Sequence, residues 1–458
     1  MGEKKLWQGR FKGASEDVTG FNSSENAALD QNLVKYDILG SIAHVKMLEK
    51  HGMLKKEEKD AIVSALKQIL QKQDKGGFEL DESLEDVHTN VENAVTAITP
   101  HGKKMHLARS RNDQILVDMR MYMRDKILEI AGAIMELQKN FAALAEKDGA
   151  MAGYTHTRVA QPITISFWCD SFVQSFYRDL DRILECFKRV NENPLGACAL
   201  AGTSWNIDRG YTARLLGFDD IQENELDAIT SRGEVEAEML SDLSIMMTKL
   251  SGLAEELIWL SQKQLIALPD EFCTGSSIMP NKKNPDALEL IRARAGRVYS
   301  NLVHALTVKK SLISGYHSDM QESKHAIMGG AGTTLECVAM MAKIIKKIKF
   351  NQGAIEQELE AGFAQATEIA DALAKKGVPF RDAHSIVGKL VGECETQGIT
   401  LSKAKPLPQF NEKEWKGLVS IERARLKRKI AIDGEHAKAV KEISGGIEGA
   451  FKNLLLLF

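Results

Sequence analysis

Residues 275–285, which read GSSIMPNKKNP, concentrate the side chains of this chain that are best suited to chemistry. Ser276 and Ser277 offer adjacent hydroxyls, Lys282 offers an ammonium group and Asn284 a carboxamide. Hydroxyls and lysines bind carboxylate oxygens, and a helix that starts after the loop adds the positive end of its dipole. Asn284 and the proline after it are typical of such a start, as an N-cap and a first helical residue. The stretch predicts an anion-binding loop before a helix, with an ordinary solvated connection as the alternative.

Two earlier segments hold polar side chains that could complete a binding site. His88 and Asn90 lie in SLEDVHTNVENAVT, where the histidine is either a hydrogen-bonded structural residue or part of a pocket wall. Arg111 and Asn112 lie in SRNDQ at the start of a long helix. A planar guanidinium beside a helix N-terminus binds a carboxylate well, although a surface charge is the alternative.

Two later segments add a proton carrier and further polar contacts. Thr155 and His156 lie in GYTHTRVAQP, before another helical run. An imidazole with its ordinary pKa of about 6.5 exchanges a proton near neutral pH, and a plain surface histidine is the alternative. The segment SGYHSDMQESK supplies Tyr316, Gln321 and Lys324 at a helix junction.

Long helices are the elements that must position these side chains. The chain has only nine prolines, with none from 195 to 268 or from 286 to 378, and aromatic residues are 6%, which together favour long helices over strands. Helices are predicted at 35–53, 56–73, about 111–149, 164–190 and 285–314.

A strict heptad repeat marks one of these helices as part of a bundle. Its apolar residues alternate at spacings of four and three: Met239, Leu243, Met246, Leu250, Leu253, Leu257 and Leu260. This repeat predicts left-handed packing, within the subunit or between subunits. We expect three domains: an N-terminal helical domain at 1–109, a central long-helix bundle with the loop at 110–360, and a small helical domain at 361–458.

Composition narrows the class of protein. The 458 residues are 44% hydrophobic and 27% charged with a net charge of -3, so no basic field predicts a nucleic-acid or membrane partner. The six cysteines form no CxxC pair, and the glycine-rich passage 193–209 has no phosphate-binding pattern. We therefore expect free thiols, no metal and no nucleotide cofactor. The N-terminus lacks a signal-peptide core, which predicts a cytoplasmic protein.

Four dispersed segments together resemble one family. They read EDVHTN, SRNDQ, GYTH followed by AQP, and GSSIMPNKKNP, with GVPFRDAH as support near the end. The loop looks like the signature GSSxMPxKxNP of the fumarase and aspartase superfamily, and its combination with SRNDQ and GYTH is similar to argininosuccinate lyase and the delta-crystallins. The resemblance implies an all-α, three-domain fold whose central helices assemble into a homotetramer, with each site drawn from three chains.

The resemblance also implies a reaction and roles for named residues. The reaction is reversible elimination of fumarate from argininosuccinate, a step of arginine biosynthesis, without a metal or organic cofactor. Ser276 and His156 would be the acid and base, and which of them takes the proton stays open. Lys282, with Asn284 and loop amides, would stabilise the carbanion, and Glu289 would orient His156.

The remaining implied contacts are to the carboxylates and amino group of the substrate. They are Arg111, Asn112, Thr155, Ser277, Asn284, Tyr316, Gln321 and Lys324, with His88 and Asn90 nearby. One position departs from the family: Asn26 stands where relatives usually have a serine, and Ser23 and Ser24 are displaced. The alternatives are another superfamily lyase (adenylosuccinate lyase, aspartase or fumarase) and a catalytically silent crystallin-like protein.

Overall fold

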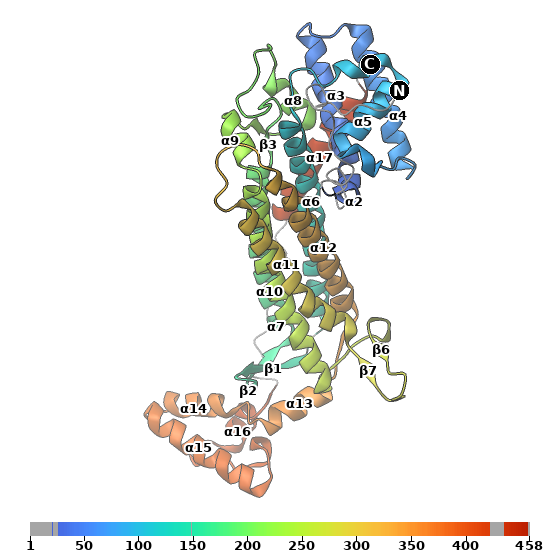
Figure 1. Ribbon diagram of the computed structural model, residues 1–458. Coiled ribbons are helices and arrows are strands. Elements are labelled where there is room, and N and C mark those ends of the chain that lie inside the picture. The colour runs from blue at the N-terminus through green and yellow to red at the C-terminus, as the bar shows by residue number, and fades with distance from the viewer. Residues whose placement is uncertain (1–20, 22–25, 148, 422–434, 457–458) are drawn as a thin grey trace.

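Five long helices set the shape of the molecule. The structure is a computed structural model that describes residues 21, 26–147, 149–421 and 435–456. The five helices run side by side between a helical head and a smaller base (Figure 1). They are α6 (Arg111–Ala145), α7 (Ile165–Val190), α10 (Glu234–Gln262), α11 (Asp286–Lys309) and α12 (Ser323–Lys347). At 1.5 Å per residue, the 35 residues of α6 span about 52 Å.

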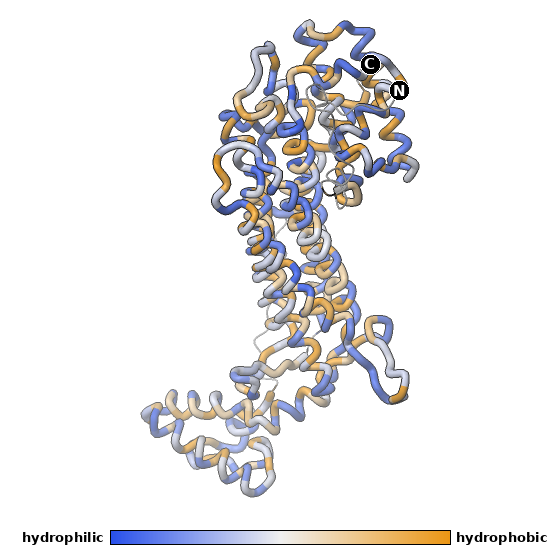
Figure 2. The backbone as a smooth tube through the Cα atoms, viewed as in Figure 1, coloured by the Kyte–Doolittle hydropathy of each residue, from blue (hydrophilic) through white to orange (hydrophobic). Residues whose placement is uncertain are grey.

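The heptad repeat is the inner face of this bundle. All seven seam residues of α10, from Met239 to Leu260, are at most 1% exposed, and α10 packs against α7, α11 and α12. The predicted core role of the seam is confirmed. Along the helices of the bundle, hydrophobic and hydrophilic residues alternate, as in amphipathic helices packed around a common core (Figure 2).

The head is built from shorter helices around the beginning of α6. These are α2 (Asn26–Asp30), η1 (Gln31–Leu33), α3 (Val34–Lys50), α4 (Lys56–Asp74), η2 (Glu82–Leu84), α5 (Val87–Ile98), η3 (Pro100–Lys104), α8 (Arg209–Leu216), α9 (Glu225–Thr230) and α17 (Glu435–Leu456). Arg124 of α6, fully buried, holds the end of α8 by donating to the carbonyls of Leu216 and Gly217, both at 3.0 Å. A cation at these carbonyls complements the negative end of the helix dipole.

Short β-ribbons and small helices occupy the base and the helix connections. The antiparallel pairs are β1 (Ala150–Thr155) with β2 (Arg158–Thr164), β5 (Ile266–Ala267) with β8 (Lys349–Phe350), and β6 (Thr274–Gly275) with β7 (Lys283–Asn284), while β3 (Glu192–Asn193) and β4 (Asp220–Ile221) are parallel. The remaining helices are η4 (Asp270–Phe272), η5 (Ser318–Glu322), α13 (Gln352–Ala361), α14 (Ala366–Lys375), α15 (Phe380–Gln397), η6 (Leu401–Lys403) and α16 (Glu412–Leu418). The sequence did not predict the ribbons.

The predicted helices are confirmed as α3, α4, α6, α7, α10 and α11, although α11 ends at Lys309 and not near 314. The end of the chain differs from the predicted grouping. Helices α14 to α16 share a separate hydrophobic cluster, whereas α17 packs on α3, α6 and α8, and its Val440, Ile447 and Leu454 belong to the main core. The expected unit at 361–458 is thus divided, because the apolar face of α17 is buried in the head.

No helix within the described residues is both long enough and apolar enough to cross a membrane.

Replacing Leu250 by alanine tests the seam. Leu250 is fully buried, so Leu250→Ala leaves a cavity and is expected to lower the free energy of unfolding by about 3 kcal/mol. Urea denaturation at a fixed protein concentration measures it. The half-buried neighbour Ser251, changed to alanine, is the control, with a change below about 0.5 kcal/mol. Equal effects of the two substitutions would contradict the conclusion that the seam of α10 is a tightly packed part of the core.

Acid should weaken the head through His44. Burial, followed by the charge of Arg109, lowers the pKa of His44 to about 3 from its usual 6.5, while the ring Nε2 bonds the Leu107 carbonyl at 2.7 Å. Between these pH values the unfolded chain binds the proton and the folded chain does not. Stability is therefore lost as pH falls through this window, by about 1.4 kcal/mol per pH unit for this group.

The measurement is urea denaturation of the native chain and of His44→Gln from pH 6.5 to 4.5. Glutamine keeps a donor for Leu107 but does not titrate, so its curve should be flatter. Parallel curves for the two proteins would show that His44 is not the group responsible.

Candidate active site

A pocket of about 560 Å³ opens in the head, where the start of α6 meets α5, η5 and the start of α12. It is lined by Phe21, Asp30, Glu85, Asp86, His88, Arg111, Asn112, Ile115, Tyr316, Ser318, Gln321, Glu322, Lys324 and His325. Six of the predicted substrate-binding residues are among them: His88, Arg111, Asn112, Tyr316, Gln321 and Lys324.

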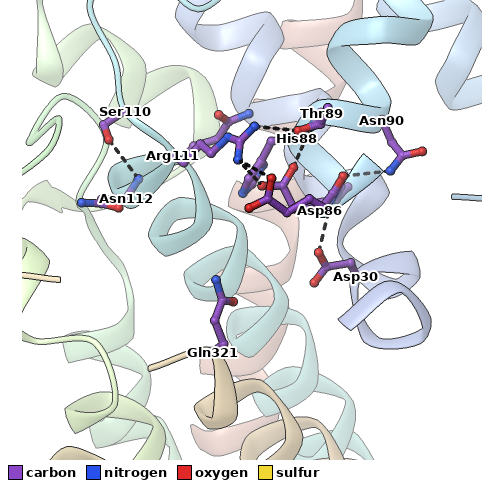
Figure 3. A network of polar contacts seen from close by, with 12 residues as sticks. Asp30, Asp86, His88, Thr89, Asn90, Ser110, Arg111, Asn112 and Gln321 are labelled. Carbon is purple, nitrogen blue, oxygen red and sulfur yellow. Dashed lines mark hydrogen bonds and ion pairs between the residues drawn. The ribbon is translucent and has the colours of Figure 1, made fainter. Parts of the chain in front are cut away.

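Arg111 is held at the pocket wall by the start of α5 (Figure 3). Its Nη2 donates to Thr89 Oγ1 at 2.7 Å, and its Nη1 lies 3.2 Å from the Asp86 carboxylate and 3.6 Å from that of Glu85. Asp86 is also the N-cap of α5 and accepts from the Thr89 amide at 2.8 Å. The planar guanidinium is thereby fixed between two carboxylates and a hydroxyl, which orients it for an anion in the pocket.

The SRNDQ segment starts α6 and anchors a neighbouring loop. Ser110 and Asp113 form a capping box, with the Ser110 amide donating to Asp113 Oδ1 at 2.9 Å. The other oxygen of Asp113 accepts from two amides of the 196–198 turn, at 2.8 and 3.0 Å. Burial raises the pKa of Asp113. Asn112 donates to the Ala199 carbonyl at 3.1 Å, so the loop and the pocket residue are held together.

Lys324 brings a buried charge to the pocket from the first turn of α12. Its Nζ lies 2.6 Å from Asp30 Oδ1, and the other oxygen of Asp30 accepts from the Val87 amide at 3.2 Å. Burial lowers the pKa of Lys324, an effect that the Asp30 carboxylate opposes. Both side chains are at most 2% exposed, so loss of either partner would leave an unpaired buried charge.

Tyr316 and Gln321 meet on the η5 side of the pocket. Gln321 Nε2 donates to the Tyr316 hydroxyl at 2.9 Å, and the Arg232 guanidinium lies 5.6 Å from the centre of the tyrosine ring. Asn90 does not line the pocket. It is buried on α5 and its carboxamide accepts from the Asp81 amide at 2.8 Å, so this predicted contact residue is engaged within the head.

His88 lines the pocket and belongs to a buried polar cluster. Its Nδ1 bonds Asp37 Oδ1 at 2.8 Å, and Gln114 Nε2 donates to the same oxygen at 2.5 Å. Asp37, His88 and Asp118 are close enough to share a metal ion. The donor set fits a hydrogen-bonded cluster better, because Asp37 Oδ1 already has two donors and the charge of Arg109 acts on both acids.

The signature loop lies far from this pocket, on the ribbon of β6 and β7 beside the lower part of the bundle (Figure 1). Ser276 Oγ accepts from the amides of Ile278 and Met279, at 3.3 and 3.1 Å. Ser277 and Lys282 are exposed, and Ile278 at the tip is 83% exposed. Two N–H groups directed at one hydroxyl oxygen stabilise negative charge on it.

Asn284 does not cap α11, and that prediction is wrong. Its Nδ2 donates across the ribbon to the Gly275 carbonyl at 3.4 Å, and the N-cap position falls on Pro285 without a side-chain bond. Pairing of β7 with β6 holds Asn284 in an extended conformation, which displaces the helix start by one residue.

His156 lies at the tip of the β1–β2 hairpin, where it is exposed. His156 and Thr157 form the two-residue turn, with φ of 52° and 58°, as a type I′ turn requires. Thr157 is β-branched, so this left-handed conformation is strained. Thr155 is exposed at the end of β1.

The predicted residues therefore fall into three separate groups: the pocket, the hairpin tip, and the ribbon with the nearby Glu289. The 24 residues of α11 place about 36 Å between the ribbon and the η5 side of the pocket. About 52 Å of α6 separates Arg111 from the hairpin. Among the described residues, no hydrogen bond or ion pair joins Glu289 to His156. One chain alone does not bring the predicted acid-base residues to its pocket.

Several acidic pocket residues were not predicted, namely Asp30, Glu85, Asp86 and Glu322. Asp86 had a usable signal, since an aspartate directly before the first apolar residue of a helical run is typical of an N-cap. The others come together only through helix packing. Ser23 and Ser24 lie outside the described residues, as does the side chain of Asn26, so the structure does not place the departure from the family pattern.

Two family models and a group of related proteins match this chain. A family model described as "Lyase" matches residues 9–300, and one described as "Argininosuccinate lyase C-terminal" matches residues 363–424. The argininosuccinate lyase of Desulforamulus reducens is 43% identical over 448 residues, which cover 96% of this chain and 95% of that protein.

Solved structures agree with this fold. EDDS lyase in complex with formate superposes with a TM-score of 0.83 at 25% identity, covering 96% of this chain and 95% of that one. The class II fumarase of Schistosoma mansoni, at a TM-score of 0.75 and 16% identity over 88% and 92% of the two chains, shares the fold. With a relative 43% identical along almost its entire length and a matching C-terminal family model, this chain belongs to the argininosuccinate lyase family.

Proposed function

We propose that this protein is an argininosuccinate lyase, a carbon-nitrogen lyase that eliminates fumarate reversibly from argininosuccinate and leaves L-arginine. The observation that carries the proposal is a pocket of mixed charge in a chain of this family. Arg111 and Lys324 present cations, and Asp86 and Glu322 present carboxylates. Argininosuccinate bears carboxylates together with an amino and a guanidino group, so both signs of charge in the pocket have a counterpart on the substrate.

The elimination needs a base, an acid and a stabilised carbanion. Ser276 is the base in this proposal, because the two amides that donate to its Oγ favour negative charge there. Ser276 takes the proton from the carbon next to a carboxylate, the carbon-nitrogen bond breaks, and His156 protonates the departing guanidino nitrogen. Lys282, Asn284 and loop amides stabilise the carbanion, at about 3 kcal/mol for each well-placed donor. Glu289 orients His156.

Substrate binding is assigned to the remaining residues. Those in the pocket are His88, Arg111, Asn112, Tyr316, Gln321 and Lys324, with Asn90 behind them; those outside it are Thr155 on the hairpin and Ser277 on the ribbon. The pocket holds the amino-acid end of the substrate, and the ribbon closes over the end that becomes fumarate. No metal or organic cofactor takes part in the proposed reaction.

The three groups of residues meet in a homotetramer, with each site drawn from three chains. The separations along α6 and α11 support this, since no single chain spans them. An apolar face on α11 supports it as well: Leu290, Val303 and Leu306 are between 53% and 62% exposed. Such a face on a bundle helix is typical of burial against a second copy.

The cytoplasm and arginine biosynthesis are the proposed setting of this reaction. The six cysteines are free thiols, and all but Cys273 are buried. Free thiols fit a reducing compartment.

Removing the Ser276 hydroxyl tests the assignment of the loop. Ser276→Ala should lower fumarate release from argininosuccinate by about 10³-fold or more, because the proton acceptor is lost. Fumarate is followed by its ultraviolet absorbance. Ser385→Ala, an exposed serine on α15, is the matched control and should leave the rate unchanged. A folded native protein that forms no fumarate would refute the lyase proposal itself.

Mixing two inactive variants tests the shared site. His156→Gln and Ser276→Ala are each expected to be inactive alone. After the two chains are unfolded together and reassembled, activity should return, because some sites then draw their hairpin and their ribbon from chains that are intact there. Native mass spectrometry confirms that mixed oligomers form. Mixed oligomers without any activity would exclude a site built from different chains.

A further inference from the structure

Two buried aspartates lie near the same ring nitrogen of His88, and they differ in their hydrogen-bond partners. Asp37 Oδ1 on α3 lies 2.8 Å from His88 Nδ1 and accepts from Gln114 at 2.5 Å. Asp118 on α6 lies 3.7 Å from the same ring nitrogen, and both of its carboxyl oxygens are buried without a hydrogen-bond partner. Both aspartates are fully buried, so the difference between them is one of partners and not of exposure.

The partners determine which carboxyl group carries the charge. Two donors and the nearby Arg109 lower the pKa of Asp37 against the effect of burial, and the charge of His88 is the largest favourable contribution. Burial raises the pKa of Asp118 well above its usual range, and the charge of Asp37 adds to this. Two adjacent carboxyl groups in a dry site favour one proton between them. These directions favour the charge on Asp37 and the proton on Asp118.

This arrangement orients the imidazole. With Asp37 ionised, His88 Nδ1 carries a hydrogen and donates it to Asp37, which leaves Nε2 on the opposite side of the ring. His88 lines the pocket and is 5% exposed, so Nε2 is the nitrogen that the pocket can use. A carboxylate that holds the far nitrogen of a functional histidine sets both its tautomer and its direction.

We propose that Asp37 is a positioning residue of this enzyme, which acts through His88 by holding the ring with Nε2 toward the substrate. Asp37 itself touches no substrate, because it is fully buried on α3 beneath the histidine. The inference rests on the proposed function, since it concerns substrate in the same pocket. It adds a residue that neither the sequence motifs nor the pocket lining contains.

A double-mutant cycle on Asp37 and His88 tests the proposal. Asp37→Asn keeps the shape but removes the charged acceptor, so KM for argininosuccinate should rise about 10- to 100-fold, with a much smaller change in kcat. His88→Gln should have a similar effect. In the His88→Gln background, Asp37→Asn should add less than about threefold, because its partner is already gone. Fumarate release measures both constants, and thermal melting checks that each variant is folded.

The chain offers a matched control in a second aspartate-histidine pair. Asp181 lies 2.8 Å from His436 Nε2, outside the pocket, and Asp181→Asn should leave KM and kcat unchanged. Asp118→Asn should raise KM several-fold less than Asp37→Asn, because a protonated carboxyl group and a carboxamide are both neutral. Effects of equal size at Asp37 and Asp118 would overturn the assignment of charge.

The activity of the native protein tests the proposed function, and the KM of the Asp37→Asn variant tests the positioning role of Asp37. A native protein without activity refutes the proposed function, whereas an active native protein whose Asp37→Asn variant has the native KM refutes the positioning role alone. The positioning role is also refuted if the rise in KM of the double variant equals the product of the two single rises. That result would show that Asp37 acts independently of His88. If Asp37→Asn does not fold, Gln114→Met serves instead. It removes the second donor to Asp37, and its smaller rise in KM should vanish in the His88→Gln background.

Discussion

The burial of one apolar seam along α10 is the interaction on which the rest of the structure depends. Its seven residues are almost completely removed from water between α7, α11 and α12. A bundle held in this way is a rigid rod, and its length determines how far apart the side chains at its two ends must lie. Residues at the two ends of α6 stay about 52 Å apart whatever the loops do. The separation of pocket, hairpin and ribbon follows from this rod, and it is the reason for proposing a site shared between chains.

Polar burial in the head has a different role. Arg124, the Lys324–Asp30 pair and the cluster beneath His88 are all removed from solvent. Such groups contribute little net stability when paired, but they are costly when a partner is lost. They therefore restrict how α3, α5, α6 and α12 meet more sharply than apolar packing would. The pocket is lined by side chains whose directions are set in this way, which suits a site that must recognise several charges on one small molecule.

The hairpin, the ribbon and the pocket lie on different parts of the fold. The pocket residues sit at helix ends tied by buried ion pairs, whereas His156 occupies a strained two-residue turn and Ser276 an exposed ribbon. Exposed tips on rigid supports can reach a neighbouring subunit and close over a substrate. A single chain thus carries its predicted site residues at three separate places, and the proposed homotetramer would bring one group of each kind together.

The sequence by itself determined the helical class, most helix positions and the buried seam, and it singled out the segments whose side chains suit chemistry. These follow from local rules, since heptad spacing, capping residues and proline placement act over a few residues. Only the tertiary structure decided that α17 returns to the head, that strand pairing removes Asn284 from the cap of α11, and that Asp30, Asp86 and Glu322 share the pocket. It also distinguished Asp37 from Asp118, which look alike in sequence. The physical reason is that burial and hydrogen-bond partners are set by residues distant in the chain, and charge state depends on both.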